Sequence, residues 1–316
     1  MGGGPVRLSA AAAIQASWGR FGERWGSRTA SLGRHASILL TLLLLVVIVR
    51  ALSRVDLNGA FELRSFPPTF YLAFLVFFLA SPLIDWLILR HLWQAPYSGL
   101  QAIFRKMVYN EMLVSYLGDA SLLAWIRREL AHVKAPFAVV KDWAIVSAFV
   151  GSVTTLIAIA FAWPLLRNVD HSGLGAPLAL ALALPLANGS AIVLFHKRLL
   201  SLPRREIGWI GGACALRIAA QMAAAITMWW SLMPQIPMTT WLALAAVRMV
   251  STRLPLVPNK DLAFAAVTVA LIGQHDAIAP MIVMITSLVL IANILVAIGI
   301  SLFVVAQAIG RRAARS

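Results

Sequence analysis

Two short segments of the chain carry charged residues in a matching pattern. In each, an arginine precedes a Met-Val pair, and a lone aspartate follows the arginine by 14 or 13 residues. Arginine and lysine bind phosphate oxygens through charge-assisted hydrogen bonds. The pattern therefore predicts that both segments contact an anionic group. The segments are 104–125, with Arg105 and Asp119, and 247–267, with Arg248 and Asp261.

A third candidate is an arginine inside an apolar stretch. Arg217 lies between 211 and 230, and Gln221 follows one helical turn later on the same face. A charge at the centre of a membrane helix costs about 2.5–3.5 kcal/mol, so it usually faces a cavity or a partner. We expect lipid-phosphate binding by Arg217, Arg248, Arg253, Lys260 and Arg105. The alternative is that Arg217 forms an ion pair with Asp85 or Asp119 that only fixes packing.

Carboxylates accompany these cations. They are predicted to relay protons or to form ion pairs, with Gln221 as a neutral partner. The alternative is a set of salt bridges that only hold two halves of the protein together. The predicted carboxylates are Asp85, Glu111, Asp119 and Asp261.

The composition shows what kind of element must position these side chains. With 60% hydrophobic and 12% charged residues, the chain is typical of a membrane protein. The net charge of +15 would suggest nucleic acid binding in a soluble protein, but here the basic residues lie at the ends of apolar runs, where they orient spans. One cysteine and no ligand-like histidine spacing predict neither a metal site nor a cofactor.

The apolar runs predict six crossings, and most Lys and Arg residues then fall on one side with both termini, which is the cytoplasmic side. Residues 1–35 and 307–316 are basic cytoplasmic tails. Tryptophans near the span ends, including Trp143, Trp229 and Trp241, are typical of interfacial anchors. The predicted spans are 36–52, Thr69–Leu89, Trp143–Trp163, Leu174–Phe195, Ile207–Leu232 and Ala277–Ala306.

The two charged segments are too polar to cross the membrane. Most Lys and Arg residues fall on the cytoplasmic side only if each segment enters and leaves the membrane on the same side. We therefore expect an all-α polytopic membrane protein of about six transmembrane helices plus two re-entrant helical hairpins, arranged in an inverted repeat. The membrane domain is 36–306, with repeats at about 36–165 and 174–306. The alternatives are amphipathic surface helices or pairs of marginal spans.

Residues in both segments resemble a known family. Asn110 with Gly118-Asp119, and Leu254-Pro255 with Pro258 and Gly273, are similar to the two signature regions of the lysylphosphatidylglycerol synthase transmembrane (flippase-like) family. The resemblance covers most of 39–306. The chain departs from that pattern where the family has a glycine-rich turn, because Asn259-Lys260-Asp261 stands there. The glutamate that the family carries next falls near Ala265.

This resemblance implies movement of an anionic phospholipid or a lipid-linked intermediate between membrane leaflets. The excess of Arg over Lys and the abundance of Ala favour a bacterial inner membrane. The partners are then membrane lipids. The soluble aminoacyl-transfer domain of some relatives has no room here, so we expect no synthase activity, and no catalytic motif is recognised. Two alternatives stay open: a non-catalytic membrane partner of a lipid-modifying enzyme, and a polyprenyl-phosphate-dependent transferase that uses Asp56 and Glu62.

Overall fold

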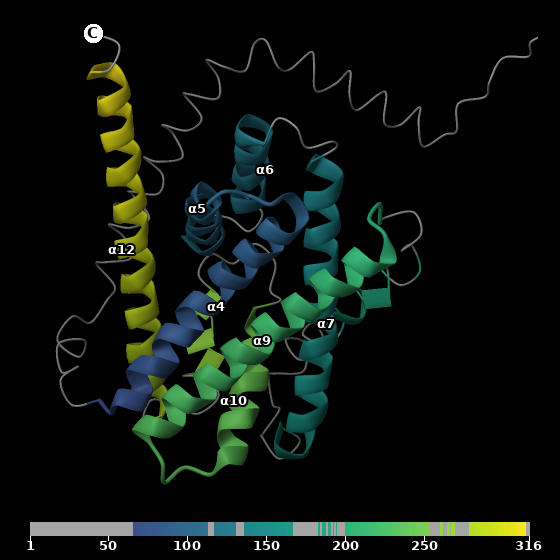
Figure 1. Cartoon of the computed structure of the whole chain (residues 1–316). Coiled ribbons are helices and arrows are strands. Elements are labelled where there is room, and N and C mark those ends of the chain that lie inside the picture. Colours follow the sequence, from purple (N-terminus) through teal and green to yellow (C-terminus); the bar gives the residue numbers. More distant parts are fainter. Residues whose placement is uncertain are drawn as a thin grey trace, which may run out of the picture. The chain divides into compact units, whose positions relative to one another are not determined.

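The described part of the chain is helical. No strand occurs among the described residues, so the all-α class is confirmed for them. The computed structural model describes residues 66–112, 117–130, 136–166, 200–252 and 278–313, with isolated positions within 183–194 and 260–268 (Figure 1).

Four long helices are apolar enough to cross a bilayer. The shortest has 26 residues, which at 1.5 Å per residue exceeds the roughly 30 Å of the hydrocarbon core. They confirm that four of the predicted apolar runs are helices of sufficient length to cross a membrane. The other two, at 36–52 and 174–195, lie outside the described residues except for isolated helical positions, so the number six stays a prediction. The four helices are α4 (Pro68–Trp93), α7 (Pro136–Leu166), α9 (Arg204–Leu232) and α12 (Ile278–Ala313).

Three shorter helices correspond to the charged segments. With 15, 13 and 14 residues, each is about 20 Å long and cannot cross the bilayer alone. Helical residues between 260 and 268 follow the third. The order long, short, short, long therefore occurs in full once along the described chain; in the second half, a long and a short helix are followed by isolated helical positions and then by a long helix. The short helices are α5 (Ser98–Met112), α6 (Leu117–Glu129) and α10 (Met238–Ser251).

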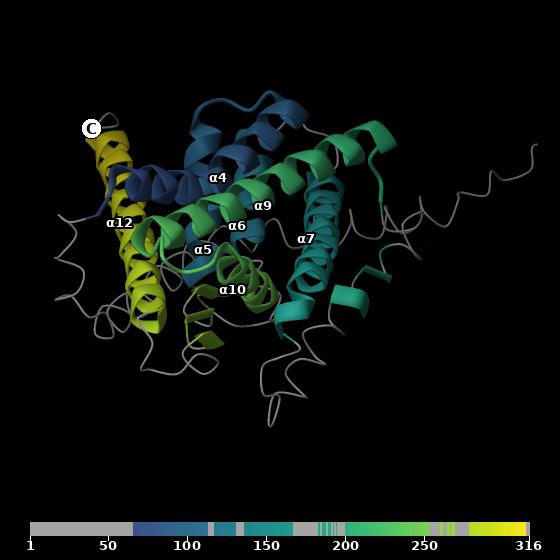
Figure 2. The same ribbon diagram turned by 90° about the horizontal axis from the view of Figure 1, so that it is seen from below.

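Helices α4 and α9 pack side by side in opposite directions (Figures 1 and 2). His91, at the end of α4, lies 2.9 Å from Glu206, at the start of α9. Farther along the pair, Gln221 of α9 reaches the carbonyl oxygen of Phe77 of α4. Two further contacts join the halves reciprocally, because α5 contacts α12 and α10 contacts α7.

Prolines mark where several helices begin. Pro67 and Pro68 precede and open α4, Pro203 precedes α9, and Pro237 precedes α10. Proline suits these positions because the first helical residues need no backbone N–H donor. The local sequence therefore favours the start of these three helices at the observed positions.

Two apolar clusters form the core. One packs the first half of α4 against the end of α9 and the start of α12, and the other packs the end of α4 against α5, α6 and α7. Trp143, Trp229 and Trp241 belong to these clusters and are at most 2% exposed. The prediction that they are interfacial anchors is wrong, because packing between helices buries them. Trp209 and Trp230, by contrast, are 39% and 46% exposed.

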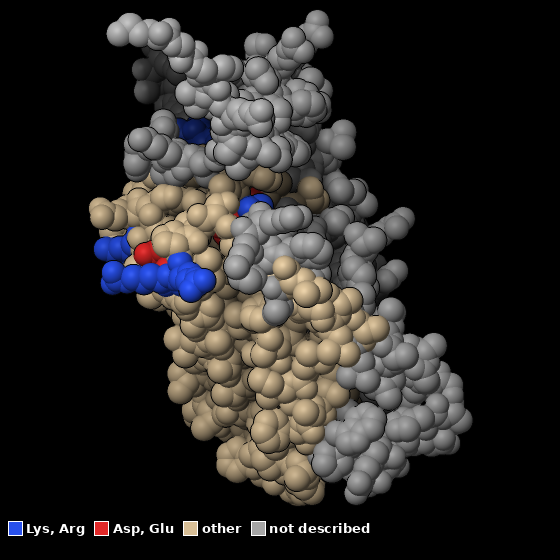
Figure 3. Space-filling model, turned by 90° about the vertical axis from the view of Figure 1, so that its right-hand side faces the viewer, with Lys and Arg blue, Asp and Glu red and all other residues tan. Residues whose placement is uncertain are grey.

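Charged side chains gather at one end of the described surface. Figure 3 shows them at one level, above a broad area that carries none. The exposed arginines follow this pattern, since they occur at the ends of α4 and α6 and at the start of α9. Many exposed side chains of the long helices are large and apolar. This distribution matches a helical protein inserted in a membrane.

Candidate functional site

Asp85 of α4 lies at the centre of a buried ion-pair network. Its Oδ2 accepts a hydrogen bond from Lys106 Nζ at 2.9 Å, and its Oδ1 accepts one from Arg217 Nη1 at 2.5 Å. Arg217 also donates through Nη2 to Ser147 Oγ at 2.8 Å. The network joins α4, α5, α7 and α9. Both carboxylate oxygens have a cationic donor, so the buried charge of Asp85 is compensated.

Lys106 of α5 extends this network to α6. Its Nζ lies 3.3 Å from Asp119 Oδ1 and 4.1 Å from the centre of the Trp143 ring. An ammonium over an indole face is stabilised by a cation–π interaction. The sequence left open whether Arg217 pairs with Asp85 or Asp119. In the structure Arg217 pairs with Asp85, and Asp119 pairs with Lys106.

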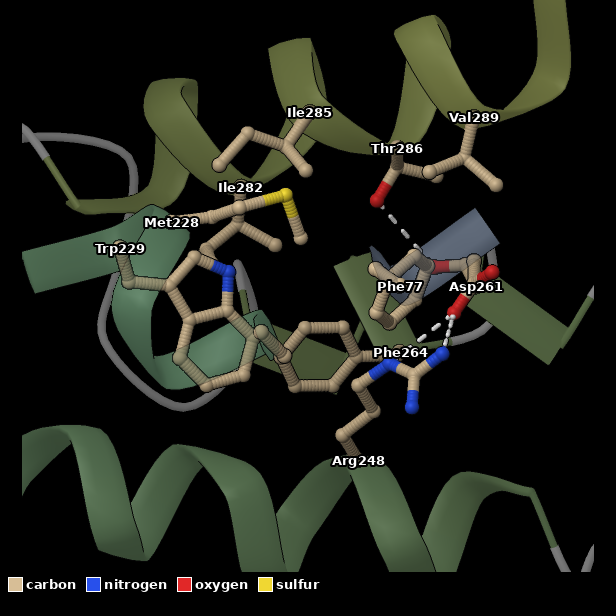
Figure 4. Close-up of a pocket in the computed structure, with 11 residues that line it drawn as sticks. Phe77, Met228, Trp229, Arg248, Asp261, Phe264, Ile282, Ile285, Thr286 and Val289 are labelled. Atoms are coloured by element: carbon tan, nitrogen blue, oxygen red, sulfur yellow. Dashed lines mark hydrogen bonds and ion pairs between the residues drawn. The ribbon is translucent and has the colours of Figure 1, made fainter. Parts of the chain in front are cut away.

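A second ion pair links α10 to the residues around 261. Arg248 donates to Asp261 Oδ1 from Nε at 3.1 Å and from Nη2 at 2.7 Å. Figure 4 shows Arg248 pointing from α10 toward Asp261, with Thr286 of α12 on the opposite side. The guanidinium carbon lies 4.6 Å from the centre of the Phe77 ring. The pocket drawn there holds about 20 Å³, which is space for about one water and not for a ligand.

The two ion pairs have the same spacing in the chain. Asp261 follows Arg248 by 13 residues, and Asp119 follows Lys106 by the same number. The pattern read from the sequence began instead at Arg105, one residue earlier. Arg105 does not line the cavity described below, so Lys106 is the equivalent of Arg248.

Asn110 and Gly118, two of the predicted motif residues, contact each other. The Gly118 N–H donates to Asn110 Oδ1 at 2.8 Å, which ties the start of α6 to α5. A Cβ atom on Gly118 would collide with the backbone carbonyl oxygen of Lys106 and lie 2.6 Å from Asn110 Oδ1. Only glycine therefore permits this approach, which holds Asp119 beside Lys106.

A cavity of about 420 Å³ lies between the helices and collects most of the predicted site residues. Both ion pairs line it, so it receives side chains from both charged segments. Its polar lining residues are Ser81, Asp85, Lys106, Asn110, Glu111, Asp119, Ser147, Arg217, Gln221, Arg248, Thr252, Lys260, Asp261 and Asn293.

The charges that line the cavity are balanced when all are ionised. Four are cations, at Lys106, Arg217, Arg248 and Lys260, and four are carboxylates. Three of the cations already form ion pairs with carboxylates. Among the described residues, Lys260 has no such pair, which makes it the cation available to a ligand.

Some predicted residues fall outside the description. Arg253, Pro255 and Pro258 lie outside the described residues, as do Asp56 and Glu62 of the transferase alternative.

Sequence reasoning also missed a residue of the cavity wall. Asn293 is 7% exposed, and its Oδ1 has no hydrogen-bond partner among the described residues. The sequence signal for this residue is a single asparagine in the middle of the apolar run 277–306, because a polar side chain in such a run usually faces a cavity or the interior of the helix bundle.

Comparisons with known proteins do not assign this chain to a family. The resemblance to the flippase-like family therefore stays a prediction. No family model, curated protein or solved structure matches the chain.

Proposed function

We propose that this chain is an integral membrane protein that moves an anionic phospholipid or a lipid-linked intermediate between leaflets, with the head group in the cavity. The observation that carries the proposal is the cavity of about 420 Å³ lined by four cations between apolar helices. This volume falls within the roughly 300–1,000 Å³ of small-molecule sites. Buried charges in such surroundings are usually retained for function.

The acyl chains of the lipid have apolar surface to follow. Phe161 of α7 is 82% exposed, and Leu72 of α4 and Leu302 of α12 are both above 60%. A head group in the polar cavity with its chains on such surfaces avoids carrying a charge through hydrocarbon. This separation is what lowers the barrier to movement between leaflets.

The same proposal includes an inverted repeat with two re-entrant hairpins. Support comes from the order of a long helix followed by a short one in each half, the opposite directions of α4 and α9, and the reciprocal contacts α5–α12 and α7–α10. The equal spacing of the two ion pairs adds to it. Transporters with inverted repeats bind their substrates where the repeats meet, and the cavity takes residues from both.

We place the protein in a bacterial inner membrane with its basic end in the cytoplasm. This orientation predicts that Arg205→Cys, at the start of α9, reacts with a membrane-impermeant maleimide only from the cytoplasmic side. Gln235→Cys, in the turn after α9, should react only from the other side. Both changes are made with Cys214→Ala, which removes the buried native thiol. Labelling of both from one side in intact cells would contradict the orientation.

The transport proposal is tested with proteoliposomes that hold the purified protein and fluorescent anionic phospholipids. Wild type should redistribute the lipid between leaflets. Lys260→Met should slow this redistribution at least about tenfold, because it removes the cation available to the lipid phosphate. The charged hydrogen bond lost in this way is worth about 1.5–3 kcal/mol of binding free energy. Arg217→Ala should abolish lipid movement, because it removes a second cation of the cavity.

Arg128→Ala is the control, because Arg128 is exposed and pairs only with its neighbour Glu129 among the described residues. It should leave lipid movement unchanged. Wild-type vesicles that redistribute none of the tested lipids, with folded protein, would refute transport by this chain.

That outcome would favour a second candidate, the non-catalytic partner of a lipid-modifying enzyme. One observation supports it, since three of the four cavity cations are already neutralised by ion pairs. Such pairs can serve only to hold helices together.

A further inference from the structure

Glu111 differs from the other carboxylates of the cavity. It lies on α5, is half-buried and lines the cavity. Asp85, Asp119 and Asp261 each form an ion pair. Glu111 forms none with another described residue. It is therefore the cavity carboxylate whose charge is least compensated.

The charged groups that face Glu111 come from the second segment. Asp261, Lys260 and Arg248 are close enough to act on its carboxyl electrostatically. Arg248 and Asp261 largely neutralise each other through their ion pair at 2.7 Å. The groups left over are Glu111 and Lys260, which carry opposite charges.

Other elements around the cavity add no uncompensated charge near Glu111 among the described residues. Asp85, Lys106, Asp119 and Arg217 form one connected network in which each charge has an opposite partner. Helix α12, which contacts α5, contributes Asn293 to the lining, which does not titrate.

The surroundings of Glu111 favour its protonated form. Burial raises the pKa of its carboxyl, and the Asp261 carboxylate raises it further, while Lys260 and Arg248 act in the opposite direction. Glu111 lies on α5, outside the four apolar spans. Because its pKa is raised, Glu111 takes up a proton at a higher pH than an exposed glutamate does.

Protonation changes the charge available to a ligand. With Glu111 ionised, four cations face four carboxylates, and the cavity is neutral. With Glu111 protonated, the lining carries one net positive charge, and the charge of Lys260 is no longer opposed by the Glu111 carboxylate. An anionic head group is then attracted by about one additional unit charge at close range.

We propose that Glu111 is a proton-binding site that couples the pH to occupancy of the cavity by an anionic phospholipid head group. The inference rests on the proposed function and adds a coupling ion to it. One proton from water binds the Glu111 carboxylate as one anionic head group enters, so the charge of the occupied cavity stays balanced. Loss of that proton weakens the site and releases the head group.

The test is calorimetric titration of the full-length, detergent-solubilised protein with short-chain phosphatidylglycerol between pH 5 and pH 8. Wild-type affinity should fall about tenfold or more as the pH rises through the pKa of Glu111. Binding should take up a proton, which is read from the dependence of the heat on the ionisation enthalpy of the buffer.

Two variants isolate the residue. Glu111→Gln should bind tightly at every pH without proton uptake, because the amide stays neutral. Glu111→Asp should keep both the pH dependence and the uptake. Glu129→Gln, which removes an exposed carboxylate outside the cavity, should behave as wild type.

The outcomes separate the two proposals. Wild-type binding that does not vary with pH, or equal proton uptake by Glu111→Gln, would overturn the role of Glu111 and leave the lipid site intact. No binding at any pH by folded wild type would overturn both proposals. Binding that is tight and independent of pH in Glu111→Gln, but dependent on pH in wild type, Glu111→Asp and Glu129→Gln, supports both proposals.

Discussion

Replacing Asp85 by leucine should destabilise the protein more than any other single change in the cavity. Asp85 is 5% exposed and neutralises both Lys106 and Arg217. In the variant, Lys106 keeps its ion pair with Asp119, but the buried guanidinium of Arg217 loses its carboxylate partner. Removing one member of a buried ion pair costs about 3–5 kcal/mol, so we expect a large drop in the melting temperature of the solubilised protein.

Arg217→Met is the matched comparison. It should cost less, about 1.5–3 kcal/mol, because Asp85 keeps its hydrogen bond from Lys106 at 2.9 Å. Combining both changes should recover part of the loss of Asp85→Leu, since the uncompensated guanidinium is then absent. Asp85→Leu melting at the temperature of Arg128→Met, a change at an exposed arginine, would show that the network does not stabilise the fold.

The sequence predicted the apolar helices well and the charged contacts only partly. Runs such as Thr69–Leu89 and Ile207–Leu232 have the length and apolar composition of membrane-spanning helices, so α4 and α9 could be predicted from them. Charged residues in apolar surroundings must face one another or a cavity. This reasoning selected Arg217, Asp85 and Glu111, and all three line one cavity.

The choice of partners could not be predicted, because it depends on packing between distant elements. Lys106 and Arg105 are neighbours in sequence, but successive helical positions differ by about 100° in direction. Only the contact of α5 with α4 decides that Lys106 faces Asp85. The burial of Trp241 escaped prediction for the same reason, since its position near a span end fits an interfacial anchor equally well.

Gly118→Ala should disrupt the approach of α6 to α5. Its new methyl group would collide with the carbonyl oxygen of Lys106 and lie 2.6 Å from Asn110 Oδ1, so the two helices must separate. Overpacking of this kind costs about 1–3 kcal/mol. The separation would also lengthen the 3.3 Å contact of Asp119 with Lys106. We therefore expect a lower melting temperature together with slower lipid movement in proteoliposomes.

Gly212→Ala is the control for this change, because it makes the same substitution where the structure has space. A Cβ at Gly212 of α9 meets no atom within 4 Å, and alanine favours a helix over glycine by about 1 kcal/mol. This variant should melt at or above the wild-type temperature and move lipid normally. Equal behaviour of the two variants would show that the Gly118 contact does not position Asp119. A loss confined to Gly118→Ala would instead mean that a motif residue, which touches no charge itself, sets the geometry of the ion pair.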